Sequence, residues 1–183
     1  MNDWSQHRSQ KELEKRHLNH FLDSYFHATG ERLQIHETTE RPDFLCEREN
    51  GMTVGVELTQ IVRNPDDAEW EEILEGQQFM TLEGALERIQ DQTLRKDKKR
   101  SEDDWKLSGR TILILQLMDI PLWKIGSMLT DEILPDLQET NFSEIWMADF
   151  TTIEAFGEVE LFAFYHPELS GNQHLLDHKK PYG

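Results

Sequence analysis

The fold of this chain is decided by the stretch Arg41-Pro42-Asp43-Phe44-Leu45-Cys46 together with Val54-Gly55-Val56-Glu57-Leu58-Thr59. Both parts are strand-like, and the second is rich in β-branched residues, so the pair predicts two adjacent strands. Asn50-Gly51 lies between them and is typical of a hairpin turn. The hairpin carries one acid on each strand, Asp43 and Glu57, and two carboxylates aimed at one point are a way to hold a divalent metal.

Loop length decides whether these two acids share a face of the hairpin. A two-residue turn at Asn50-Gly51 would pair Phe44 with Glu57 and send Asp43 to the opposite face. A three-residue loop, Glu49-Asn50-Gly51 with its glycine left-handed, would instead pair Asp43 with Glu57. Directly opposed Cβ atoms lie about 4.5–5.5 Å apart, close enough for both carboxylates to reach one cation. A shared site therefore requires an odd-length loop or a bulge.

The rest of the chain alternates between helical and strand-like segments. Helical spacing of apolar residues predicts helices over about 10–27 and 82–104, and a continuous apolar run predicts a buried strand over 111–118. The other expected elements are strands over 33–38, 144–150 and 159–165, an acidic helix over 66–75 and a partly helical segment over 121–137. This order predicts an α/β fold with a mixed β-sheet flanked by helices, in a single domain over 1–183.

Composition predicts a soluble globular protein. Hydrophobic residues make up 37% of the 183 residues and charged residues 30%. We expect no membrane span, since no run of eighteen or more apolar residues exists. We also expect no secretory signal, because residues 1–7 lack a basic end followed by an apolar stretch. The single cysteine, Cys46, is typical of a reducing compartment, so the cytoplasm is the expected location.

The net charge of −17 disfavours a nucleic-acid partner at long range. The charge is unevenly distributed, however. Eight acids and no base lie between residues 66 and 87, whereas five bases fall within the six residues 95–100. The basic run is compatible with phosphate contact, although a solvated helix face is the usual explanation of such a run. The acidic segment suits a lid, a solvated helix or a docking surface for a basic protein partner.

The chain resembles the PD-(D/E)xK, or restriction-endonuclease-like, superfamily of nucleases. The resemblance rests on Pro42-Asp43, thirteen intervening residues and Glu57-Leu58-Thr59, set between a leading and a following helix. In element order it extends from about Glu12 to Tyr165, and it implies a restriction-endonuclease-like αβββαβ core. The resemblance further implies a Mg²⁺- or Mn²⁺-dependent nuclease acting on DNA or RNA.

The same resemblance implies a set of site residues. Asp43, Glu57 and the backbone carbonyl of Leu58 would bind the metal, and Glu14 of the first helix is a further candidate acid. The family's last motif position is usually lysine, but here it is Thr59. Some family members with this ending look as though the lysine has moved to the next helix. Helical spacing makes Lys96 the first candidate for that role, because it shares a face with Ile89 and Thr93, and Lys99 is the second.

Histidine and cysteine patterns offer weaker alternatives. His17-x-x-His20 and His174-x-x-x-His178 have helical ligand spacing for zinc, but surface histidines explain both pairs better because no cysteine cluster accompanies them. Cys46 faces away from Asp43 along its strand and is interpreted as a small core residue.

Three hypotheses follow. The first is a metal-dependent nuclease that uses Asp43, Glu57 and Lys96. The second is the same fold retained as a catalytically inactive interaction module, which the threonine at position 59 and the acidic charge favour. The third is an acidic inhibitor that mimics nucleic acid and binds a basic protein.

Overall fold

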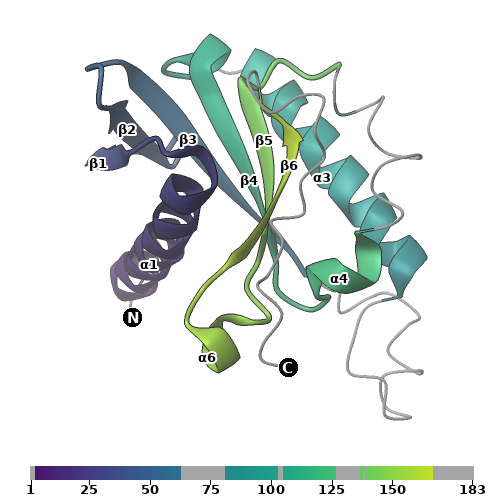
Figure 1. The fold of residues 1–183 in the computed structure, drawn as a ribbon. Helices are drawn as coiled ribbons and strands as arrows, with labels where there is room; N and C mark the ends of the chain where they lie inside the picture. Colours follow the sequence, from purple (N-terminus) through teal and green to yellow (C-terminus); the bar gives the residue numbers. More distant parts are fainter. Residues whose placement is uncertain (1–2, 63–80, 103–104, 127–136, 138, 167–183) are drawn as a thin grey trace.

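The computed structural model describes residues 3–62, 81–102, 105–126, 137 and 139–166 (Figure 1). Its strands form one six-stranded mixed sheet in the order β1-β2-β3-β4-β5-β6. They are β1 (Leu33–Thr38), β2 (Phe44–Arg48), β3 (Thr53–Ile61), β4 (Thr111–Leu117), β5 (Glu144–Asp149) and β6 (Glu160–Tyr165). The β1-β2-β3 pairs are antiparallel, β3-β4-β5 are parallel, and β6 is antiparallel to β5. The predicted mixed α/β class is confirmed.

Helices cover both faces of this sheet (Figure 1). The long helices are α1 (Asp3–Thr29) and α3 (Leu82–Glu102), and the short ones are α4 (Leu122–Ile125), α6 (Ile153–Phe156) and the 3₁₀ turn η1 (Ser108–Arg110). One apolar cluster joins α1 to Val54, Val56 and Leu58 of β3, and a second joins α3 to Ile61 and to alternate residues of β4 and β5. Period-two alternation along the central strands therefore supplies two cores, one on each face.

The first helix is longer than its apolar pattern predicts. It begins at Asp3 rather than near Gln10, because residues 3–9 are mostly polar and do not extend the apolar stripe from which the helix was predicted. It ends at Thr29, close to the expected end near residue 27. Gly30 adopts a positive φ of 75° and its N–H donates to the carbonyl of Phe26 at 2.8 Å, as in a glycine-terminated helix.

The hairpin between β2 and β3 has the three-residue loop. Glu47 pairs with Thr53 and Phe44 with Val56, and the Arg48 N–H donates to the Met52 carbonyl at 2.9 Å. Gly51 lies in the left-handed region with a φ of 79°. Of the two loop lengths, only the three-residue loop gives a register that places Asp43 opposite Glu57.

Strand β3 lies inside the sheet, between β2 and β4, so Glu57 is not on an edge strand. Some expected segments lie outside the described residues: the acidic helix over 66–75, the part of the acidic segment up to residue 80, positions 127–136 and the histidines of the C-terminal tail. No helix in the described part of the chain is long and apolar enough to cross a membrane.

Candidate functional site

Asp43 and Glu57 meet at the start of β2. The Asp43 N–H donates to Glu57 Oε2 at 3.2 Å, and Asp43 Oδ2 accepts the Leu58 N–H at 2.9 Å. Each acid is therefore held by the backbone of the other strand. The two hydrogen bonds fix the carboxylates side by side, as the three-residue loop requires.

Glu57 is the buried member of the pair, with 4% of its surface exposed. Its second oxygen, Oε1, accepts a hydrogen bond from Lys96 Nζ, which reaches it from α3. Burial raises the pKa of Glu57 to about 7, and the neighbouring Asp43 charge adds to the rise, whereas Lys96 opposes it. Lys96 therefore pairs with a carboxylate whose charged form is disfavoured by burial.

The loop before Asp43 is held by a close approach to Gly55. A Cβ on Gly55 would lie 2.7 Å from Pro42 Cγ and 2.9 Å from Thr111 Oγ1. Glycine is required here because Pro42 packs directly over its Cα. This contact sets the position of the residue that follows Pro42, which is Asp43.

Asp43 opens into a cleft of about 840 Å³. Its lining combines carboxylates, amides and two cations: Gln10, Leu13, Glu14, Asp43, Leu58, Thr59, Gln60, Val62, Gln92, Arg95, Lys96 and Gln116. Thr59 occupies the position where the family usually has a lysine. It is buried, and its Oγ1 has no hydrogen-bond partner in the described part of the chain. Of the residues proposed for the site from the sequence, Asp43, Leu58, Glu14 and Lys96 line this cleft, whereas Glu57 and Lys99 do not.

The basic run does not form one solvated face, which corrects that interpretation. Lys96 and Arg95 line the cleft, whereas Lys99, the second candidate for the missing lysine, is exposed on α3 and is not among the lining residues. Arg100 is buried, pairs with Asp97 at 2.9 Å and lies over the ring of Phe142. Helical rotation disperses neighbouring charges around α3, so the run divides among three environments.

Glu14 reaches the site through a lysine that was not singled out from the sequence. Lys11 Nζ lies 3.1 Å from Glu14 Oε2 and 3.2 Å from Asp43 Oδ1. The i,i+3 spacing of Lys11 and Glu14 is visible in the sequence, but the contact with Asp43 joins residues 32 positions apart. Within the described residues, no three histidine, cysteine, aspartate or glutamate side chains cluster closely enough to hold a metal ion.

His17 and Cys46 have structural environments. His17 is buried, so its assignment to the surface is wrong. Its Nδ1 lies 3.1 Å from Gln116 Nε2, and its ring packs 4.6 Å from that of Phe150. Burial lowers the pKa of His17. Cys46 is buried in the core on the α1 side, as expected, and burial raises the pKa of its thiol to about 12.

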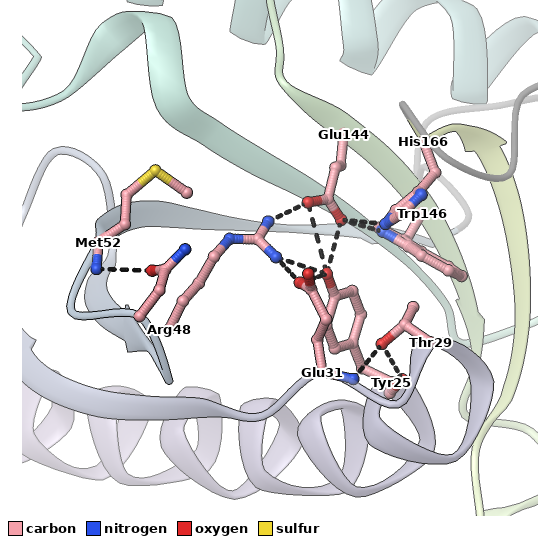
Figure 2. Close-up of polar contacts among 9 residues, drawn as sticks. Tyr25, Thr29, Glu31, Arg48, Met52, Glu144, Trp146 and His166 are labelled. Carbon is pink, nitrogen blue, oxygen red and sulfur yellow. Dashed lines mark hydrogen bonds and ion pairs between the residues drawn. The ribbon is translucent and has the colours of Figure 1, made fainter.

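A second buried polar cluster lies on the α1 face of the sheet (Figure 2). It consists of Tyr25, Glu31, Arg48, Glu144, Trp146 and His166. Arg48 pairs with both Glu31 and Glu144, and Glu144 also accepts hydrogen bonds from the Tyr25 hydroxyl at 3.1 Å and from Trp146 Nε1 at 2.8 Å. Burial and the Glu144 charge both raise the pKa of Tyr25, so its hydroxyl stays a donor.

Comparison of the chain with protein families, with curated proteins and with solved structures finds no match. Function is therefore inferred from the site alone.

Proposed function

We propose that this chain is a metal-dependent nuclease-like protein that hydrolyses phosphodiester bonds in nucleic acid. The observation that carries the proposal is the Asp43–Glu57 pair, with Lys96 bound to Glu57 and with Asp43 and Lys96 both lining one cleft. The order of α1, the β1-β2-β3 meander, α3 and the parallel strand β4 also agrees with the αβββαβ core that the resemblance implies.

The donor chemistry at the pair fits a hard divalent cation. Carboxylate oxygens are the ligands that Mg²⁺ and Mn²⁺ prefer. The pKa of Glu57 is raised first by burial and then by the Asp43 charge, and a bound cation would lower it. Asp43, Glu57 and the Leu58 carbonyl would hold the ion. When bound, such an ion supplies an activated water and offsets charge on the scissile phosphate.

Lys96 takes the role of the lysine missing at Thr59. Its ammonium group lies against Glu57 and lines the same cleft, so it can orient a water or contact a phosphate oxygen next to the pair. Arg95, one residue earlier, adds a second positive charge to the lining. These two cations give the cleft a local attraction for phosphate that the net charge of −17 does not.

A cleavage assay tests the proposal. The full chain is incubated with single- and double-stranded DNA and RNA in the presence of Mg²⁺ or Mn²⁺, beside an Asp43→Ala/Glu57→Ala double variant. Glu47→Gln is the matched control, because Glu47 lies on the same hairpin and is exposed. Cleavage by the wild type and the control, but not by the double variant, is expected. Cleavage that persists in the double variant removes these acids from the mechanism.

A second candidate function is a catalytically inactive module with the same fold. The observation that favours it is that both oxygens of Asp43 and both of Glu57 already have protein partners, two from backbone N–H groups and two from lysines. Calorimetry distinguishes the candidates. An inactive module shows no Mg²⁺ or Mn²⁺ binding that depends on Asp43, whereas a nuclease does.

A further inference from the structure

Lys11 lies in a cage of three oxygens. Its Nζ is 3.2 Å from Asp43 Oδ1, 3.1 Å from Glu14 Oε2 and 3.3 Å from the Thr39 carbonyl oxygen. These partners come from two elements, since Glu14 lies on α1 with Lys11, whereas Thr39 and Asp43 bound the connection between β1 and β2. An ammonium group has three hydrogens, and three oxygens surround this one.

The loop geometry explains why the Thr39 carbonyl belongs to the cage. The Thr39 N–H donates to the Asp43 carbonyl at 2.9 Å, and the Thr39 hydroxyl donates to the Pro42 carbonyl. These contacts close the loop on itself, which brings Thr39 next to Asp43. The cage is therefore built by the same loop that positions the acid.

This set of donors is the one that a hard cation takes. Two carboxylates and a backbone carbonyl are typical ligands of Mg²⁺ or Ca²⁺. Burial lowers the pKa of Lys11, but the charges of Asp43 and Glu14 outweigh it and hold the pKa above its ordinary value. Lys11 is thus held in its charged form by the two acids, and 19% of its side chain remains exposed.

Lys11 acts on the oxygen of Asp43 that a metal would need. Asp43 Oδ2 is held by the Leu58 N–H, so Oδ1 is the oxygen that is not tied to the backbone, and Lys11 binds it. Glu14 Oε2 is shielded from solvent and makes no well-aligned hydrogen bond in the described structure, so its stabilisation comes from the ion pair with Lys11.

We propose that Lys11 is the internal counter-ion of Asp43 and competes with a divalent cation for it. The inference rests on the proposed function in one respect, which is that Asp43 binds metal. When a cation reaches Asp43, the Lys11 ammonium group leaves Oδ1 and stays with Glu14 and the Thr39 carbonyl. Lys11 thereby sets the metal concentration at which the site loads, and it is a positioning residue rather than a catalytic one.

Metal binding by the full chain, measured by calorimetry with Mg²⁺ and with Mn²⁺, tests this proposal. Lys11→Met keeps much of the side-chain length and removes the charge, so it should bind either ion about tenfold tighter than wild type, equivalent to about 1.4 kcal/mol. Lys11→Arg keeps the charge and should bind like wild type. Lys15→Met is the matched control, because Lys15 lies one turn further along α1 and is exposed.

Equal or weaker binding by Lys11→Met, or binding by neither protein, overturns the proposal. A gain as large in Lys15→Met also overturns it, because the effect would then be general to charge on α1. Should Lys11→Met not fold, as judged by thermal unfolding, Lys11→Gln provides the same comparison with a shorter polar side chain.

A cleavage assay on the same proteins separates the two proposals. Tighter metal binding by Lys11→Met without cleavage by any form supports the counter-ion role and counts against the nuclease. Metal-dependent cleavage by wild type, with unchanged metal affinity in Lys11→Met, supports the nuclease and overturns the counter-ion role.

Discussion

Two buried glutamates on one sheet have contrasting surroundings. Glu144 of β5 is 1% exposed and Glu57 of β3 is 4% exposed, and each is paired with a cation. Glu144 faces α1 and receives donors from Arg48, Tyr25 and Trp146, as Figure 2 shows. Glu57 faces α3 and receives one lysine and one backbone N–H.

The difference lies in how completely each charge is satisfied. The donors to Glu144 come from a guanidinium, an indole and a phenol, which are planar groups held by the surrounding core. Glu57 lies next to a second acid, and its cation is a lysine that lines a cleft. The same residue type is thus part of the scaffold at position 144 and a candidate reactive group at position 57.

The largest expected effect is on stability. Glu144→Gln leaves Arg48 with only part of its buried charge compensated, so we expect a loss of roughly 3–5 kcal/mol in the free energy of unfolding. Glu57→Gln removes a carboxylate whose charge is penalised by burial, so at pH 8 it should be neutral or stabilising. Urea unfolding of the two variants measures both values. Equal losses would remove the distinction between the clusters.

The next effect concerns activity. If the cleft is the nuclease site, Lys96→Met should lower the rate of cleavage on the order of 10²–10³-fold, as expected for losing a charged group beside the reacting phosphate. It should also lower stability by roughly 1–3 kcal/mol, because it leaves the buried Glu57 carboxylate without its cation. Lys99→Met on the exposed face of α3 is the control and should cleave normally. A similar loss in both variants would deny Lys96 a special role.

The third effect is a dependence of stability on pH. The pKa of Glu57 is about 7 in the folded chain against an ordinary value of 4.5, so between these values the folded state binds more protons than the unfolded one. Stability from this group is therefore fully present below pH 4.5 and is lost as the pH rises through 7, by on the order of 3 kcal/mol at most. Unfolding curves for wild type and Glu57→Gln between pH 5 and 8 should converge at low pH. Parallel curves would contradict the shift.

The smallest effect tests the support beneath the pair. Gly55→Ala places a methyl group against Pro42 and Thr111, which should cost about 1–2 kcal/mol through overpacking. Because Pro42 precedes Asp43, the same change should also weaken any metal binding. Gly109→Ala is the matched control, since nothing lies within 4 Å of a Cβ at that position. If calorimetry finds the two variants alike, the close approach at Gly55 does not position the site.

Much of the hairpin could be predicted because local rules govern it. Pairing arithmetic left two loop lengths open and made the three-residue loop the condition for a shared face. The structure has that loop, and Gly51 supplies the positive φ that it needs. Lys96 was chosen from Lys96 and Lys99 by helical periodicity, and it is the one that contacts Glu57. The catalytic role of these residues stays a prediction.

The Glu144 cluster and Lys11 could not be predicted in the same way. Glu144 meets Arg48 and Tyr25 across 96 and 119 positions of the chain, and no local pattern connects them. The surface prediction for His17 used only the local helical spacing of histidines. Its partner Gln116 lies on β4, 99 positions away, and no local pattern indicates that contact. Such pairings depend on which face of the sheet each helix covers.

By itself, the sequence determined the hairpin, the buried strand β4 and the two long helices, because these follow from periods of 2 and 3.6 residues and from turn chemistry. Only the tertiary structure decided that β3 is an interior strand, that Lys11 and Lys96 reach the two acids from opposite helices, and that Glu57 contacts two residues that line a cleft. The physical reason is that a side chain's charge environment is set by distant segments brought within a few ångströms, and packing rather than local propensity selects those neighbours.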